Sequence, residues 1–79
     1  MAVYFDMYKI KDDSDCVEYQ FGRSDGAYGI VKLDKVRETI KIMKPCPDDS
    51  RGAWGERACM KLARLWSKKE FPEKTEWAS

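Results

Sequence analysis

The spacing of hydrophobic residues changes near position 45 of this 79-residue chain. Before that position, apolar and polar side chains tend to alternate, which is typical of a strand with one buried face. After position 53, apolar residues recur every three to four positions, as on one face of a helix. The pattern predicts a single small α+β domain over residues 1–79. Its expected parts are a three- or four-stranded antiparallel meander (about residues 2–44) and one C-terminal helix (about residues 50–70) packed on one face of the sheet.

Four segments show the alternation, and short polar turns separate them. Strands are expected over residues 2–11, 16–22, 27–33 and 38–44. The second segment alternates most regularly, with Val17, Tyr19 and Phe21 on its apolar side. In the third segment, Gly29 predicts either a bulge or a place where a bulky neighbour lies close to the backbone. Because each turn is short, consecutive strands are expected to pair with each other.

Prolines and capping residues predict where the sheet stops and the helix begins. Pro45 and Pro47 lack the backbone N–H that a strand ladder needs, so the last strand is expected to end before them. The polar run at 48–50 offers N-cap side chains, which predicts a helix start between residues 49 and 53. The helix is expected to end at or before Phe71, because Pro72 disfavours helical geometry in the residue that precedes it.

The inward-facing positions of these elements define one expected hydrophobic core, which joins strand residues to one apolar stripe on the helix. The expected core consists of Val3, Phe5, Met7, Val17, Tyr19, Phe21, Val31, Leu33, Ile40, Ile42, Trp54, Ala58, Leu62, Leu65 and Trp66. The tail from Glu73 to Ser79 is polar apart from Trp77. We expect Trp77 to fold back onto the core, because an exposed tryptophan lowers solubility.

Composition narrows the class of protein. The chain is 43% hydrophobic and 37% charged, too apolar for a disordered segment and too charged for a membrane segment. No basic start followed by an apolar run is present, so we expect neither a cleaved secretion signal nor a membrane partner. Cys16, Cys46 and Cys59 lack the paired spacing of a disulfide framework or a zinc site, which favours a reduced, cytoplasmic compartment.

Residues suited to catalysis are scarce. The chain has no histidine, the side chain that serves most often as a general base. Its aspartates at 12, 13 and 15 lack the glycine and glutamate that complete a calcium loop. Cys46 precedes the predicted helix start, where a thiolate is favoured, but Asp48 and Asp49 oppose that charge. We therefore expect a non-enzymatic protein with no catalytic residue, no metal site and no small-molecule cofactor, and a thiol-dependent activity at Cys46 is the weakest of three hypotheses.

One candidate binding surface is a row of basic residues on the predicted helix. Arg57, Lys61, Arg64 and Lys68 follow one another at intervals of four, three and four residues, so they share one side of the helix. Such a row is either a solvated face that keeps the domain soluble or a surface for an acidic protein or for nucleic acid. No nucleic-acid motif accompanies it, and the formal net charge of the chain is only +1.

A second candidate surface is the outward side of the predicted sheet, where Tyr4, Tyr8 and Tyr28 fall together with Ile10 and Ile30. Tyrosine combines a large contact area with a polar tip, which makes it frequent at protein interfaces. The same pattern is also typical of an ordinary solvated sheet face, or of a surface that stacks single-stranded bases, although the motif expected of such a surface is absent.

Together these features favour a small bacterial protein-binding module, with a protein partner or a second copy of the chain as its ligand. A toxin-neutralising immunity protein is one concrete instance, although inhibitors of nucleases are often acidic and this chain is near neutral. In this hypothesis the tyrosine face makes the contact and the basic helix row attracts an acidic partner. The alternative is weak nucleic-acid binding through Arg57, Lys61, Arg64 and Lys68.

Overall fold

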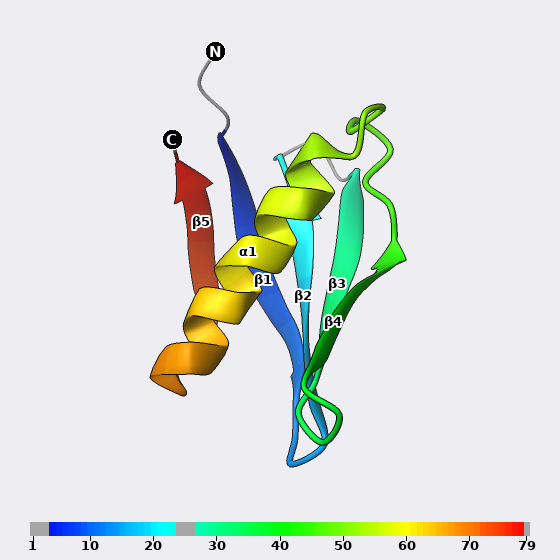
Figure 1. Ribbon diagram of the computed structural model, residues 1–79. Helices are drawn as coiled ribbons and strands as arrows, with labels where there is room; N and C mark the ends of the chain where they lie inside the picture. The colour runs from blue at the N-terminus through cyan, green and yellow to red at the C-terminus, as the bar shows by residue number, and fades with distance from the viewer. Residues whose placement is uncertain (1–3, 24–26, 79) are drawn as a thin grey trace.

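A computed structural model describes residues 4–23 and 27–78, which form a five-stranded sheet with one helix packed across it (Figure 1). The elements are β1 (Tyr4–Asp12), β2 (Cys16–Gly22), β3 (Tyr28–Asp34), β4 (Thr39–Lys44), α1 (Ala53–Lys68) and β5 (Lys74–Ala78). The strand order is β4-β3-β2-β1-β5, and every neighbouring pair is antiparallel. The α+β prediction is therefore confirmed, with five strands in place of three or four. No helix within the described ranges is long and apolar enough to cross a membrane.

The additional strand, β5, comes from the tail after the helix. It pairs with β1, with Phe5 opposite Trp77 and Tyr4 opposite Ala78. This pairing brings the last strand beside the first and completes the sheet at one edge (Figure 1). Trp77 is buried, as predicted. The strand itself was missed because Lys74–Ala78 is short and carries a single large apolar residue.

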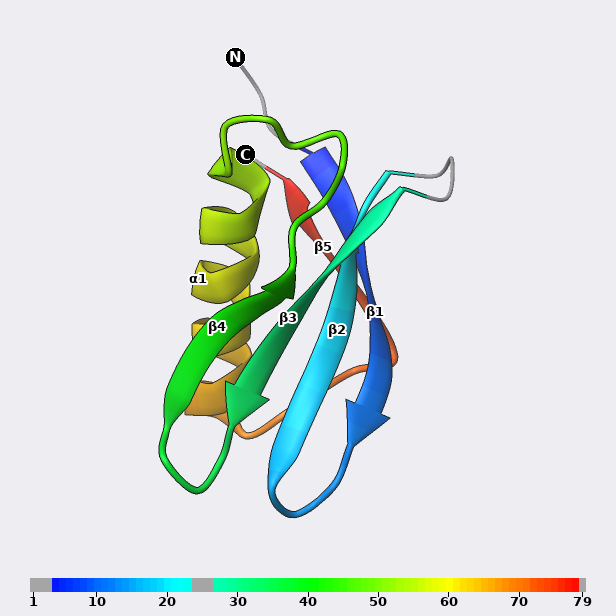
Figure 2. The ribbon, with the colours of Figure 1, turned by 90° about the vertical axis from the view of Figure 1, so that its right-hand side faces the viewer.

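The hydrophobic core lies between α1 and one face of the sheet, and Figure 2 shows the helix on that side only. Most of the predicted core is buried there, namely Phe5, Met7, Val17, Tyr19, Phe21, Val31, Leu33, Ala58, Leu62 and Leu65. Ile40, Trp54 and Trp66 are half-buried and pack against it. Val3 lies outside the described residues. The prediction for Ile42 was wrong, because β4 is an edge strand and a glycine of the helix, Gly55, faces Ile42 without covering it.

Gly29 occupies a place where other groups come very close. A Cβ atom at this position would lie 2.6 Å from the Phe21 ring, 2.7 Å from the carbonyl oxygen of Lys44 and 2.7 Å from the backbone nitrogen of Cys46. Gly29 is also opposite Phe21 in the pairing of β2 and β3. The prediction of a bulky neighbour close to this glycine is thus confirmed, and β3 can pack against the chain that leaves β4 only because this side chain is missing.

The start of α1 uses an unusual cap. Gly52 is the N-cap residue, with a left-handed backbone (φ 74°) and no side chain to bond the helix. Instead, Asp49 Oδ2 accepts a hydrogen bond of 2.9 Å from the backbone N–H of Gly55. The carboxylate therefore satisfies one of the free amides of the first turn from three residues ahead of the cap. The helix begins at Ala53 and ends at Lys68, within the predicted limits.

Candidate protein-binding surface

The sheet face opposite the helix is not covered by any described element (Figure 2). The register of the strands builds one row across this face, in which Tyr8 is opposite Lys74 on one side and Gln20 on the other. The row continues from Gln20 to Ile30 on β3 and from Ile30 to Lys44 on β4. Among the neighbours of this row along the strands, Met7, Tyr19, Phe21 and Val31 are buried in the core. The sequence prediction of an outward face that carries tyrosines is thus confirmed.

The tyrosines are not equally placed on this open sheet face. Tyr8 and Tyr28 are in contact, edge to face, with ring centroids 6.1 Å apart, and the Lys74 ammonium lies 5.7 Å from the Tyr8 ring. Tyr4 is at the end of β1 and is 43% exposed. Its hydroxyl donates a 3.1 Å hydrogen bond to Asp6 Oδ1, and this bond to a carboxylate raises the pKa of Tyr4. The structure therefore joins two of the three predicted residues and leaves the third near the rim.

The open sheet face also carries two pairs of like charges in directly opposite positions. Lys32 on β3 is opposite Lys41 on β4, and Asp6 on β1 is opposite Glu76 on β5. Like charges in cross-strand register destabilise a sheet. The two pairs have opposite signs and lie on different strands, so the face is basic at Lys32 and Lys41 and acidic at Asp6 and Glu76. Glu18 on β2 is also opposite Lys32, and Lys74 on β5 lies against Tyr8. The sequence alone did not show these pairs, because they depend on strand register and on the unpredicted β5.

The basic helix row lies on the other side of the sheet from the tyrosines (Figure 2). The Arg64 guanidinium is 5.0 Å from the Trp77 ring centroid, and Arg57 Nη1 donates a 3.3 Å hydrogen bond to the carbonyl of Ala53. Arg57 and Lys61 are half-buried, whereas Arg64 and Lys68 are exposed. Arg64 thus contacts β5, and Arg57 contacts the preceding turn of its own helix. A flat partner surface that covers the tyrosines cannot also cover this row.

Cys46 and Cys59 have different surroundings in the structure. Cys46 is buried, and its thiol donates a 3.2 Å hydrogen bond to the carbonyl oxygen of Ala27. Burial raises the pKa of Cys59, and the nearby Glu56 carboxylate raises it further. The raised pKa favours the neutral thiol of Cys59, which is a poor nucleophile.

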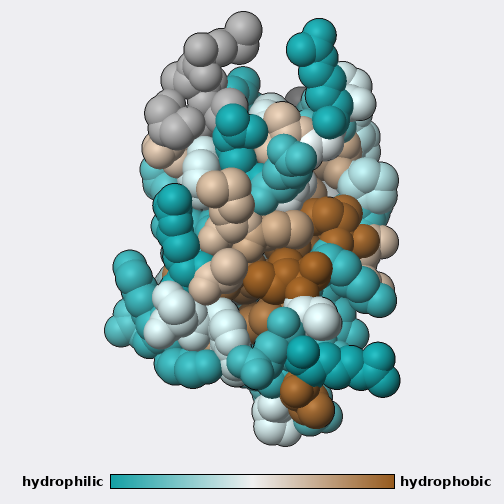
Figure 3. Space-filling model, viewed as in Figure 1, coloured by the Kyte–Doolittle hydropathy of each residue, from teal (hydrophilic) through white to brown (hydrophobic). Residues whose placement is uncertain are grey.

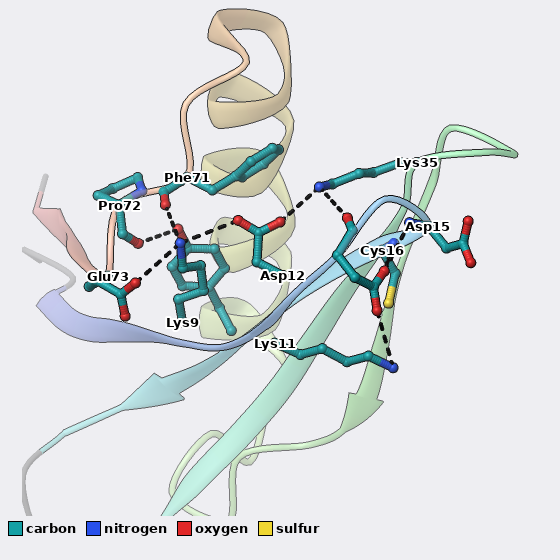
Figure 4. A network of polar contacts seen from close by, with 11 residues as sticks. Lys9, Lys11, Asp12, Asp15, Cys16, Lys35, Phe71, Pro72 and Glu73 are labelled. Atoms are coloured by element: carbon teal, nitrogen blue, oxygen red, sulfur yellow. Dashed lines mark hydrogen bonds and ion pairs between the residues drawn. The ribbon is translucent and has the colours of Figure 1, made fainter.

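A polar network anchors the connection between α1 and β5 to β1 (Figure 4). Lys9 Nζ donates a 2.8 Å hydrogen bond to the carbonyl of Phe71 and forms ion pairs with Asp12 at 3.3 Å and Glu73 at 3.4 Å. Lys35 Nζ lies 2.8 Å from Asp12 Oδ1, and this hydrogen bond lowers the pKa of Asp12. Each charged group here has a nearby partner of opposite sign. The network thus has a structural role, which explains part of the aspartate cluster seen in the sequence.

Tyr19 belongs to the same network, and it predicts how stability changes at alkaline pH. Its hydroxyl donates a 2.5 Å hydrogen bond to the carbonyl of Pro72, and burial raises its pKa from 10.0 to about 12. Because the folded protein holds this proton more tightly, the free energy of unfolding should fall as the pH rises from 10 toward 12. Tyr19→Phe should cost about 1 kcal/mol at pH 7 through the lost hydrogen bond. It should also weaken the alkaline decline.

Urea titrations at pH 7, 9, 10 and 11 measure both effects. Deprotonation of lysines contributes to the decline in both proteins, so the comparison with Tyr19→Phe isolates the tyrosine. An equal loss of stability between pH 9 and 11 in the two proteins would contradict the assignment.

Comparison with protein-family models, with curated proteins and with solved structures finds no match to this chain.

Proposed function

We propose that this protein is a non-enzymatic protein-binding module that contacts its partner through the open sheet face. Tyr8 and Tyr28 would form the centre of the contact and Tyr4 its rim. The partner surface would be acidic where it meets β3 and β4, and basic where it meets β1 and β5. A toxin-neutralising immunity protein remains one concrete instance of such a module.

The two like-charge pairs are the observation that carries this proposal. In the isolated protein, we expect the like charges of Lys32 and Lys41 and of Asp6 and Glu76 to reduce stability, with Glu18 opposite Lys32 on β2 offsetting part of the first effect. A partner with complementary charges would turn both unfavourable pairs into favourable contacts. Binding sites are where proteins commonly retain such locally unfavourable arrangements.

The tyrosines support the same surface by a different physical route. Tyr8 and Tyr28 already hold each other edge to face, so little side-chain freedom is left for a partner to remove. Aromatic residues of this kind contribute a large share of the binding energy at many interfaces.

Substitution of one charge should separate stability from binding. We expect Lys41→Glu to raise the free energy of unfolding by about 0.2 to 1 kcal/mol, because the new carboxylate would face Lys32. Glu76→Lys should do the same beside Asp6. Both variants should no longer bind the partner protein. Urea denaturation measures the first effect and affinity purification the second. A fall in stability for either variant would contradict the like-charge argument.

Affinity purification from a lysate of the source cells tests the proposal itself. A captured protein supports it only if capture is lost with Glu76→Lys and with Tyr8→Ser and is kept with Lys68→Glu, a helix-row control on the other side of the sheet. Capture that depends on Lys68, or that ignores Tyr8 and Glu76, would overturn it, as would the absence of any captured protein at low salt. Nuclease treatment of the lysate tests the alternative function, which is nucleic-acid binding. Loss of capture after that treatment, together with dependence on Arg64 and Lys68, would indicate nucleic-acid binding.

A further inference from the structure

A concave site lies between α1 and β4, on the helix side of the sheet. Its volume is about 320 Å³. Its walls include the side chains of Phe21, Ile42, Pro45, Cys46 and Cys59, so it is largely apolar. Figure 3 shows a hydrophobic patch on this side of the molecule. Ile42, Met43 and Met60 are each at least 36% exposed and are the large exposed apolar residues of β4 and α1.

The groove is open partly because Gly55, in the first turn of the helix, faces Ile42 of β4 without a side chain. Gly52 and Gly55 both line the site. A Cβ atom at Gly55 would lie 3.4 Å from Cδ1 and 3.6 Å from Cγ1 of Ile42, which is ordinary van der Waals contact. An alanine would therefore fit at this position. It would also suit a helix better than glycine does. The glycine at residue 55 thus keeps open a space that a more stable sequence would fill.

The strand beside the groove is an edge of the sheet. β4 is paired with β3 only, so its outer backbone groups pair with no other strand among the described residues. Five of its six residues are exposed. A bulge at Met43 interrupts the regular register, since Ile42 is opposite Val31 while Lys44 is opposite Ile30. The regular part available for a new strand is therefore residues 39–42.

We propose that β4 and this groove bind an extended peptide segment of another protein, which adds a sixth strand to the sheet. In an added strand, side chains alternate between the two faces. On the helix side an apolar side chain would enter the groove beside Ile42. On the other side its neighbours would lie next to Lys41 and Lys44, which point away from the helix and have no ion-pair partner within the described ranges. Charge complementarity therefore selects a peptide that alternates apolar and acidic residues.

The test uses a capped hexapeptide that alternates valine and glutamate. It should shift the amide NMR signals of residues 39–44 and 53–59, leave those of β5 unchanged, and slow amide hydrogen exchange in β4. Cys59 gives an independent readout because it lines the groove and is more exposed than Cys16 or Cys46. At a peptide concentration of about ten times Kd, alkylation of Cys59 by iodoacetamide should slow by roughly tenfold.

Two control peptides and one variant make the result specific. A valine–lysine peptide should not bind because of Lys41 and Lys44, and a serine–glutamate peptide should not bind because nothing fills the groove. Gly55→Ala should weaken binding of the valine–glutamate peptide by roughly tenfold, since the added methyl group would occupy the space beside Ile42 that the valine side chain enters. Tyr8→Ser should leave peptide binding unchanged, which separates this site from the open sheet face.

Three results would overturn the proposal. The first is no binding of the valine–glutamate peptide at millimolar concentration, and the second is binding without protection of Cys59 or without sensitivity to Gly55→Ala. The third is dimerisation through β4 in sedimentation experiments without peptide, because the edge would then be occupied by a second copy of the chain.

Discussion

Gly29→Ala should leave the protein unfolded at 25 °C. The new methyl group would lie within 2.7 Å of backbone atoms of Lys44 and Cys46, and within 2.6 Å of the Phe21 ring. Backbone atoms on two sides cannot move away as a flexible side chain end can, so we expect a loss of at least about 3 kcal/mol. A domain of this size has roughly 3 to 5 kcal/mol of stability in total. Circular dichroism with urea denaturation measures the loss.

Gly55→Ala is the matched control, because it makes the same chemical change in a place with room. Its Cβ atom would have ordinary contacts with Ile42, and alanine is favoured over glycine in a helix by up to about 1 kcal/mol. This variant should therefore be as stable as the parent protein or more so. Equal losses of stability in the two variants would show that the close contacts of Gly29 are not the cause.

Trp77→Ala should also cause a large loss in the free energy of unfolding. Trp77 is 8% exposed, packs against the core from β5, and has the Arg64 guanidinium over its ring. Truncation of a buried tryptophan to alanine costs about 3 to 5 kcal/mol, which again approaches the whole stability of a small domain. The effect should be visible as loss of cooperative thermal unfolding and loss of NMR signal dispersion.

Trp77→Phe separates packing from hydrogen bonding at this position. The indole nitrogen of Trp77 is buried and has no hydrogen-bond partner within the described residues. Phenylalanine removes that polar atom and keeps most of the ring, so the loss should be below about 2 kcal/mol. A loss as large as that of Trp77→Ala would mean that the N–H group, and not the ring, matters.

Local pattern was enough to predict the middle of this fold. In β2, Val17, Tyr19 and Phe21 alternate with polar residues and are all fully buried. The period of two fixes which side of a strand faces the core, and neither long-range pairing nor helix placement alters it. The helical stripe with Ala58, Leu62 and Leu65 was equally predictable, because a period of 3.6 defines one face.

The edges of the sheet were harder to predict because they depend on partners far away in the sequence. β5 forms where β1 offers a free edge and the core offers a place for Trp77, and neither condition is visible within residues 74–78. At the other edge, Ile42 has the right spacing for burial but faces a glycine of the helix. The residue preferences of β4 therefore predict that a strand forms, whereas the elements packed around it determine how exposed that strand is.

The candidate surfaces also differ in whether local sequence pattern was enough to predict them. The tyrosines on the open sheet face were predictable from the alternation of apolar and polar residues. The pairs Lys32–Lys41 and Asp6–Glu76 were not, because they depend on the register of β4, which contains a bulge, and on β5, which was not predicted. The groove beside β4 depends on how the helix crosses the sheet. One signal for it was present in the sequence, since Gly55 in the first turn of the helix lowers the stability of that helix.

The pairing of β1 with β5 determines how the molecule responds to mechanical force. Tyr4 and Ala78 are opposite each other at the same end of an antiparallel pair. Tension applied across these two residues loads the ladder in an unzipping direction, so its bonds rupture one after another instead of sharing the load. A motor that pulls at residue 78 would peel β5 away, withdraw Trp77 from the interior and so dismantle the domain with little resistance.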